Sequence, residues 1–599
     1  LDNGITMDMT HKIINLFGAK AKEIVLENPY ILMEKIERFG FKKNDAFALK
    51  LGIEENSMIR LKALTGYVLE EALYSAGNSY ICRSDLYIFA TKYINKEIDG
   101  KVFNEVIAIL EKEKKVYIDE ADNIYDYKMY IQEIELARGI AKILKGTTDD
   151  NKKPPVYDNE SIAAEYQKIK EKSHVEYSKE QEQAILNAFT EPIIIITGGP
   201  GTGKTTIIKN VIDIYKSHGK KVVLCAPTGR AAKRMTEMTG EEAKTLHRLL
   251  EIGKIEKDNE FTIMNYEVAP IDADVIIVDE ASMVDIYLMN YLLNGIYQGT
   301  KLILVGDTDQ LPSVGPGSVL KDIINSERIK TIFLDEIFRQ AAQSKIIVNS
   351  HRVNDGEYFL DKEEQEGLKD DFFYIKEKSQ DIMLDQIISL CKGRLKNFGD
   401  YDFFENIQIL SPTKKGLLGT KELNKKLQEE LNPSSDEKNE KKVGEVIFRE
   451  GDRVMQVKNN YDIYWEKGRK EADIKYENGT GIFNGELGRI AKIDFEEKQL
   501  EVDFDDRKTA WYAFSELEQL EHAYAITIHK AQGSEFDVVI LAIPPSSNML
   551  LTRNLLYTGI TRAKKLLIVI GSNKLIDFMV KNSENKKRNT GLKEKLKEQ

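Results

Sequence analysis

The segment that decides the fold reads Ile193-Ile194-Ile195-Ile196-Thr197-Gly198-Gly199-Pro200-Gly201-Thr202-Gly203-Lys204-Thr205-Thr206. Four consecutive isoleucines are β-branched and too few to cross a membrane, so they predict a central parallel strand that is buried on both faces. The strand stops at a turn with the spacing Gly-x-x-x-x-Gly-Lys-Thr, and the unbroken segment 205–215 predicts a helix directly after it. Strand, turn and helix in this order predict a phosphate-binding (Walker A) loop.

The residue types in this loop suit a bound nucleoside triphosphate. Its glycines let backbone N–H groups turn towards a phosphate at a helix N-terminus, which also favours anions. We expect Lys204 to reach the β- and γ-phosphates of ATP and the Thr205 hydroxyl to hold Mg²⁺. A glycine-rich turn that binds nothing is the alternative. The predicted nucleotide-binding residues are Gln181, Gly198, Gly199, Pro200, Gly201, Thr202, Gly203, Lys204, Thr205 and Thr206.

Upstream of the loop, Ser178 and Gln181 have the spacing of a capping box that starts a helix. The Gln181 amide has the donor and acceptor needed to read an adenine edge. A surface glutamine with no ligand is the alternative.

Three further apolar strands end in polar residues. The strand at 222–224 leads to Pro227 and Thr228, the strand at 275–278 to Asp279 and Glu280, and the strand at 301–305 to a turn that contains Gln310. The carboxyl ends of parallel strands form the ligand-binding edge of an open sheet. Two adjacent acids at such an edge would repel each other without a cation, which argues against a purely structural role.

These polar residues have predicted catalytic roles. We expect Asp279 to hold Mg²⁺ and Glu280 to orient and deprotonate the attacking water. Gln310 is expected to hydrogen-bond the γ-phosphate and to transmit its loss; a simple turn is the alternative there.

Composition bounds the class of protein. The chain has 599 residues, of which 42% are hydrophobic, so it is expected to form several packed domains. No stretch has the length of a membrane-spanning helix and the first residues do not form a signal peptide, so a cytoplasmic protein is expected. The three cysteines match no zinc spacing and are predicted to be reduced thiols. A net charge of −12 does not by itself indicate nucleic-acid binding. Overall charge is a weak argument, however, because a protein that moves along nucleic acid needs only a locally positive groove.

Several motifs in order resemble those of superfamily 1 helicases, and in particular the RecD-like group of the 1B branch. They are Gly-Gly-Pro-Gly-Thr-Gly-Lys-Thr-Thr at 198–206, Ala-Pro-Thr-Gly-Arg-Ala-Ala at 226–232, Asp-Glu-Ala-Ser-Met at 279–283 and Gly-Asp-Thr-Asp-Gln-Leu-Pro at 306–312. Phe338-Arg339-Gln340 and the segments 525–536 and 557–565 resemble the later motifs of that family. The resemblance covers about residues 175–575, and the N-terminal region also resembles the longer RecD-like proteins that act without RecB and RecC.

The resemblance implies an α/β fold with two RecA-like parallel-sheet motor domains, at 177–340 and at 341–446 with 521–580. ATP would lie between them, with Arg339 and Arg562 against its phosphates. The implied activity is an ATP-dependent DNA helicase that moves 5′ to 3′ on single-stranded DNA and unwinds 5′-tailed duplex, in DNA repair or recombination. The expected chain is a monomer, with single-stranded DNA-binding protein among its expected partners.

The same resemblance implies a track for single-stranded DNA across both motor domains. A lone threonine or histidine is as often a structural residue, so that alternative stays open for each position. The residues expected on the track are Pro227, Thr228, Thr245, His247, Thr413, Thr527, His529 and Lys530.

The remaining segments have coarser predictions. Residues 1–85 predict a helical region with a helix-hairpin-helix-like turn at Gly40, for which a plain packing module is the alternative, and 86–150 a winged-helix-like region. Residues 151–176 predict a linker, 249–270 a β-hairpin that the resemblance implies is a duplex-splitting pin, 447–520 a small SH3-like β-barrel insertion, and 581–599 a solvated charged tail.

Two other functions remain open from the sequence. One is a nucleic-acid-binding scaffold in which ATP only switches conformation, and the other is an RNA helicase.

Overall fold

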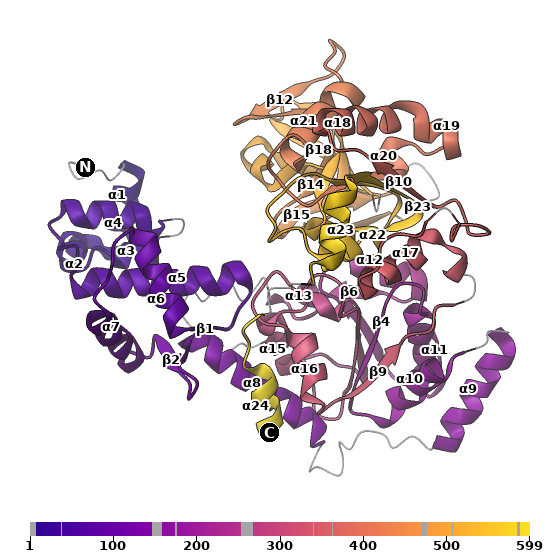
Figure 1. Ribbon diagram of the computed structural model, residues 1–599, viewed down its shortest axis with the longest axis horizontal. Coiled ribbons are helices and arrows are strands. Elements are labelled where there is room, and N and C mark those ends of the chain that lie inside the picture. Colours follow the sequence, from indigo (N-terminus) through magenta and orange to yellow (C-terminus); the bar gives the residue numbers. More distant parts are fainter. Residues whose placement is uncertain are drawn as a thin grey trace.

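The computed structural model describes residues 7–36, 39–146, 159–173, 177–252, 268–338, 341–361, 363–468, 476–505, 507–583 and 588–599. Two parallel sheets lie one above the other on one side of the molecule, and an N-terminal helical region extends from them (Figure 1). The architecture is therefore the predicted α/β fold with two motor domains. Within these described ranges, no helix is both long and apolar enough to cross a membrane.

The first motor domain is built on a six-stranded parallel sheet in the order β6-β5-β7-β8-β4-β9. Its isoleucine strand is buried on both faces: Ile193 and Ile195 join one hydrophobic core, whereas Ile194 and Ile196 join the other. The strands are β4 (Ile193–Gly198), β5 (Val222–Ala226), β6 (Ala243–Thr245), β7 (Val275–Val278), β8 (Lys301–Gly306) and β9 (Lys330–Leu334), and the helices include α10 (Lys179–Thr190), α11 (Lys204–Ser217), α12 (Gly229–Thr239), α13 (Leu246–Leu249), α15 (Ile286–Gly295) and α16 (Val319–Ser326).

The second motor domain has a five-stranded parallel sheet in the order β10-β23-β22-β11-β21. Its strands are β10 (Phe372–Lys376), β11 (Ile407–Ser411), β21 (Ala525–Thr527), β22 (Phe536–Ile543) and β23 (Ala563–Gly571), and its helices include α17 (Lys345–Asp355), α18 (Gln380–Ser389), α19 (Leu395–Gly399), α20 (Phe403–Asn406), α21 (Thr420–Leu431), α22 (Arg553–Ile560) and α23 (Asn573–Lys581). Both sheets are covered by helices, as parallel sheets require.

A seven-stranded antiparallel sheet is inserted between β11 and β21 and has its own hydrophobic core. Its strands are β14 (Arg453–Gln456), β15 (Asn460–Lys467), β16 (Glu477–Ile482), β17 (Leu487–Asp494), β18 (Gln499–Phe504), β19 (Lys508–Ala513) and β20 (Leu520–His522), preceded by the hairpin of β12 (Glu440–Val443) and β13 (Val446–Arg449). Strand β15 pairs with β16, so most of the described residues between 461 and 481 are strand residues.

The N-terminal region is helical, with a small antiparallel sheet in the order β1-β3-β2. Its elements are α1 (Met7–Phe17), α2 (Ala21–Glu27), α3 (Ile31–Lys35), α4 (Phe41–Lys50), α5 (Met58–Ala76), β1 (Tyr80–Cys82), α6 (Arg83–Ile94), α7 (Gly100–Lys112), β2 (Val116–Ile118), β3 (Asn123–Asp126) and α8 (Tyr127–Leu144). Gly40 directly precedes α4, and Phe41 at the start of that helix is buried.

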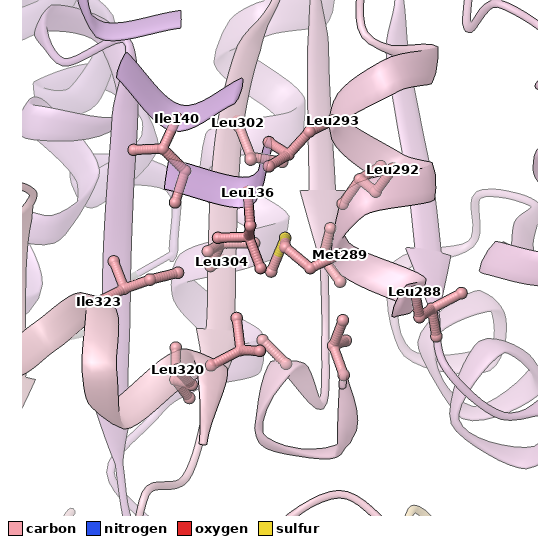
Figure 2. Close-up of a cluster of buried hydrophobic side chains, with 14 of the residues drawn as sticks. Leu136, Ile140, Leu288, Met289, Leu292, Leu293, Leu302, Leu304, Leu320 and Ile323 are labelled. Carbon is pink, nitrogen blue, oxygen red and sulfur yellow. The ribbon is translucent and has the colours of Figure 1, made fainter. Parts of the chain in front are cut away.

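Helix α8 joins the N-terminal region to the first motor domain. In Figure 2, Leu136 and Ile140 of α8 lie among leucines of α15 and β8. All of these side chains belong to the core on one face of the motor sheet. The docking is therefore apolar and continuous with the motor core.

The expectation of a solvated tail is wrong for residues 588–599. Helix α24 (Leu592–Glu598) returns to α8 and α16, far along the chain from its neighbours (Figure 1). Leu592 and Leu596 are buried in the same core as α8. The segment is highly charged, but its two leucines have i, i+4 spacing and therefore lie on one face of the helix.

Of two other predicted segments, one differs from the structure and one lies mostly outside the described residues. Within the predicted linker at 151–176, residues Asn159–Ser173 form helix α9, whose Ile162 and Tyr166 pack in the core on the other face of the motor sheet. Most of the hairpin predicted at 249–270 falls at 253–267, outside the described residues.

Candidate active site

A small cavity lies at the carboxyl edge of the first motor sheet, where the second motor domain meets it. Its volume is about 60 Å³, which holds only a few water molecules. The cavity is lined by Pro200, Lys204, Thr205, Ile208, Arg234, Asp279, Glu280, Gly306, Asp307, Gln310, Glu535, Thr561 and Arg562.

The phosphate-binding loop joins β4 to α11 as predicted. Lys204 Nζ donates to the carbonyl oxygens of Gly198 at 2.6 Å and Gly199 at 2.8 Å. Gly203 has a φ of +86°, and a Cβ there would lie 2.3 Å from the Phe338 ring, so both conformation and space require glycine. Lys204 is thus held by carbonyls of its own loop, where an incoming phosphate would compete for it.

Gln181 supports this loop from α10. The predicted capping box is present: Gln181 N–H donates to Ser178 Oγ at 3.3 Å and Ser178 N–H donates to Gln181 Oε1 at 3.0 Å. Gln181 Nε2 donates to the Thr202 carbonyl at 2.8 Å, and the side chain is buried. The amide is therefore engaged within the protein, so contact with an adenine edge stays a prediction.

The two acids leave β7 on a turn that aims them at the cavity. Asp279 Oδ1 accepts a hydrogen bond from the Glu280 N–H at 2.8 Å. Glu280 has a φ of +52°, a left-handed conformation that costs a non-glycine residue about 1–3 kcal/mol and is frequent at functional sites. Burial and the neighbouring Asp279 raise the pKa of the Glu280 carboxyl, while Arg562, Arg234 and Lys204 oppose that rise.

The turn after β8 connects the cavity to the second motor domain. Gln310 Nε2 donates to Asp307 Oδ2 at 3.3 Å, and Tyr557 Oη donates to the same oxygen at 2.6 Å. Burial and Asp307 keep the pKa of Tyr557 well above its ordinary value, so its hydroxyl remains a donor. Gln310 Oε1 is buried and has no hydrogen-bond partner among the described residues. That acceptor is available to a ligand or to water.

Further hydrogen bonds tie this turn to the second motor domain. Leu311 N–H donates to Thr558 Oγ1 at 3.0 Å, and Gln532 Nε2 donates to the Leu311 carbonyl at 2.8 Å. The turn that holds Gln310 therefore contacts α22 directly.

Arg562 reaches the cavity from the second motor domain. Its side chain is buried and donates to the carbonyls of Thr558 and Ser534, each at 3.1 Å, and to Thr561 Oγ1 at 3.0 Å. These bonds use three of its five N–H donors. Arg339 lies outside the described residues, so its position stays a prediction.

Thr205 and Asp279 line the same cavity and supply a hydroxyl and a carboxylate oxygen. These are ligand types that Mg²⁺ accepts, and it commonly binds one or two protein oxygens together with substrate phosphates. No cluster of three or more His, Cys, Asp or Glu residues capable of holding a metal occurs in the described part of the chain. The donor set thus fits Mg²⁺ brought with a nucleotide rather than an all-protein metal cage.

The residues expected on the DNA track lie at or just after the carboxyl ends of strands in both sheets. All four threonines also have local structural roles. The hydroxyls of Thr228, Thr245, Thr413 and Thr527 accept hydrogen bonds from the N–H groups of Ala231, Arg248, Lys415 and Lys530. Thr527 and Lys530 line one small pocket with Lys414, the neighbour of Thr413. Pro227, His247 and His529 follow strands β5, β6 and β21 in the same way.

Known protein families match successive parts of this chain. Family models match an ATP-dependent RecD2 DNA helicase HHH domain at 1–80, an AAA domain at 181–316, an ATP-dependent RecD-like DNA helicase SH3 domain at 423–504 and a UvrD-like helicase C-terminal domain at 522–570. The ATP-dependent RecD2 DNA helicase of Deinococcus radiodurans is 30% identical over 599 residues, which cover 99% of this chain and 76% of that protein. The chain belongs to the RecD2 helicase family.

Other proteins resemble this RecD2 family member over most of its length. The RecBCD enzyme subunit RecD of Buchnera aphidicola is 26% identical over 650 residues, covering 96% of this chain and all of that protein. The crystal structure of the Pif1 helicase from Bacteroides in complex with ADP-AlF3 and single-stranded DNA is also similar. The match covers 68% of this chain and 94% of the Pif1 chain, with 19% sequence identity and a TM-score of 0.38. Family membership makes the chain an ATP-driven DNA helicase.

Four residues of this RecD2 site were not singled out from the sequence: Arg234, Asp307, Glu535 and Tyr557. Arg234, Asp307 and Glu535 line the cavity, and Tyr557 donates to Asp307. Asp307, Glu535 and Tyr557 lie inside the helicase-like motifs, but the spacing of those motifs assigns them no place at the site. Each acts through a partner that is distant along the chain. Only the packing of the two motor domains reveals such pairs.

Proposed function

We propose that this helicase hydrolyses ATP in the cavity between its motor domains and thereby moves 5′ to 3′ along single-stranded DNA, unwinding 5′-tailed duplex in DNA repair or recombination. The observation that carries the proposal is the composite cavity, to which one domain contributes Lys204 and Glu280 and the other Arg562. Because one chain supplies both walls, a monomer is sufficient for hydrolysis.

The proposed roles follow from chemistry at named atoms. The Lys204 ammonium exchanges its loop carbonyls for β- and γ-phosphate oxygens, and the Glu280 carboxylate takes a proton from the attacking water. Thr205 and Asp279 would hold Mg²⁺, which supplies neutralisation of phosphate charge when it is bound. Arg562 uses its remaining N–H donors to neutralise charge that develops on the transferred phosphoryl group, an effect worth about 10³- to 10⁵-fold in rate in such enzymes.

Coupling to movement uses the turn at Asp307–Leu311. Loss of the γ-phosphate changes the hydrogen bonding of Gln310, and the same turn is bonded to Tyr557 and Thr558 of α22. A change at the phosphate therefore alters contacts between the motor domains. The residues expected on the DNA track belong to both domains, so opening and closing of the cavity would shift one half of the track relative to the other.

The direction of movement rests on the resemblance to the 1B branch and is tested with tailed duplexes. We expect ATP-dependent separation of duplex that carries a 5′ single-stranded tail and at least about tenfold slower separation with a 3′ tail, a factor that corresponds to about 1.4 kcal/mol. The matched control is a blunt duplex of the same sequence. Faster opening of the 3′-tailed duplex would contradict the proposed direction, and greater stimulation of hydrolysis by single-stranded RNA than by DNA would indicate an RNA helicase.

A further inference from the structure

Arg234 occupies the boundary between the two motor domains. It lies on α12 of the first domain, and its guanidinium contacts one carboxylate from each domain. Nη2 lies 2.6 Å from Glu535 Oε1, and Nη1 lies 3.6 Å from Glu280 Oε1. Glu280 follows β7 and Glu535 directly precedes β22, so one side chain spans the cleft.

Glu280 has few polar neighbours that hold its carboxylate in place. The charge of Asp279 raises the pKa of the Glu280 carboxyl, and the charges of Arg562 and Lys204 lower it. Among the described residues, however, Arg234 is the only cation within ion-pair distance of Glu280. The planar guanidinium presents its donors in a fixed fork, so an arginine held at one carboxylate fixes where its other donors point. Arg234 is thereby placed to orient the Glu280 carboxylate.

The Arg234 contacts are better suited to positioning than to stability. The side chains of Arg234 and Glu535 are 28% and 21% exposed. Ion pairs in contact with solvent contribute little, about 0–1 kcal/mol. Arg234 Nε is in addition buried without a hydrogen-bond partner among the described residues. A buried donor without a partner costs about 1–3 kcal/mol, so Nε adds nothing to the stability that the ion pairs supply.

Arg234 and Glu535 also form part of the wall of the nucleotide cavity. Both line it, and both line the larger neighbouring cavity of about 820 Å³ that lies between α12, the inserted β-domain and the second motor domain. The pair therefore separates the two cavities. Any change in the spacing of the motor domains changes this contact.

We propose that Arg234 is a positioning residue for ATP hydrolysis: anchored to Glu535 of the second motor domain, it holds the Glu280 carboxylate towards the attacking water only when the two domains are together. This inference rests on the proposed role of Glu280 as the general base. It adds a link by which the second domain controls the base through α12, separately from the direct approach of Arg562.

The test is a double-mutant cycle of Arg234→Gln and Glu535→Gln, with kcat and KM for ATP measured in the presence of single-stranded DNA. Misplacing a reacting group lowers rates up to about 10²-fold, so we expect Arg234→Gln to reduce kcat by about 10- to 100-fold. KM should stay within about threefold, because the lost interaction acts on the base and not on substrate binding. Glu535→Gln should give a smaller loss, and the double variant should be no slower than Arg234→Gln alone.

The matched control is Arg138→Gln, which removes a helical arginine whose side chain is 62% exposed and pairs with Glu135. Arg138→Gln should hydrolyse ATP as the unaltered protein does, and unchanged melting curves for all variants would show that they fold. The inference is overturned if the effects of Arg234→Gln and Glu535→Gln multiply, if the loss is mainly in KM, or if Arg234→Gln matches Arg138→Gln.

A Glu280→Gln variant in the same assay separates this inference from the proposed function. If Glu280→Gln is inactive and Arg234→Gln is fully active, the positioning role of Arg234 is wrong and the role of Glu280 as the base stands. If Glu280→Gln hydrolyses ATP at the normal rate, Glu280 is not the general base, and the inference about Arg234 fails with it.

Discussion

Replacing Glu280 by glutamine should leave ATP bound and reduce its hydrolysis by about 10²- to 10⁴-fold, the usual contribution of a general base. Glutamine keeps the size of the side chain and its capacity for hydrogen bonding but accepts no proton. The carboxylate lies in the cavity beside Asp279, on a backbone turn with positive φ that aims it there. Binding of a fluorescent ATP analogue and the rate of phosphate release in a single turnover measure the two effects separately.

Lys204→Ala is the matched comparison, because it should fail at an earlier step. Without the ammonium that faces the phosphate-binding loop, both ATP affinity and hydrolysis should fall. The two variants are therefore distinguished by binding: retained in Glu280→Gln and lost in Lys204→Ala. Phosphate release from Glu280→Gln at the rate of the unaltered protein would show that another group activates the water.

Lys595→Met should release helix α24 from α8. Lys595 Nζ lies 2.7 Å from Glu133 Oε2, and the Glu133 side chain is fully buried. The ammonium also lies over the rings of Tyr125 and Tyr130, at 4.8 Å and 4.9 Å from their centroids. Removing one partner of a buried ion pair costs about 3–5 kcal/mol, because the other charge is left without compensation.

The expected result is faster amide hydrogen exchange in α24, by about 10²-fold or more from the free energy of breaking a buried pair. Lys597→Met is the control, since it makes the same change at an exposed position of the same helix. Equal exchange in the two variants would mean that Lys595 does not hold the helix.

The sequence was most informative where the decisive signal is local. The isoleucine run and the glycine spacing around Lys204 predict a strand, a loop and a helix, because burial on two faces and positive φ restrict residue choice there. The apolar runs at 222–224, 275–278 and 301–305 predict strands for the same reason, and the structure has β5, β7 and β8 there. Apolar runs that end in Asp279 or Gln310 identify the edge of the sheet without knowledge of their neighbours.

The parts that the sequence did not reveal depend on distant partners. Leu592 and Leu596 lie among lysines and glutamates, so composition alone predicts a solvent-exposed segment. The two leucines are instead buried against α8, which removes their apolar surface from water. Helix α9 lies where a linker is predicted, because polar and charged residues dominate that segment and only Ile162 and Tyr166 anchor it. Arg234 could not be paired with Glu535 in advance, since the two residues are far apart in the chain and belong to different motor domains.

The central claim is that the phosphates of ATP are held from both motor domains at the moment of cleavage. Its most direct test is the structure of the protein with ADP, aluminium fluoride and single-stranded DNA, in which the fluoride group stands in for the transferred phosphoryl group. We predict that the Arg562 guanidinium donates to the fluoride from one side while Lys204 donates from the other. A fluoride group contacted by the first motor domain alone, with Arg562 still bonded only to Ser534, Thr558 and Thr561, would contradict the account.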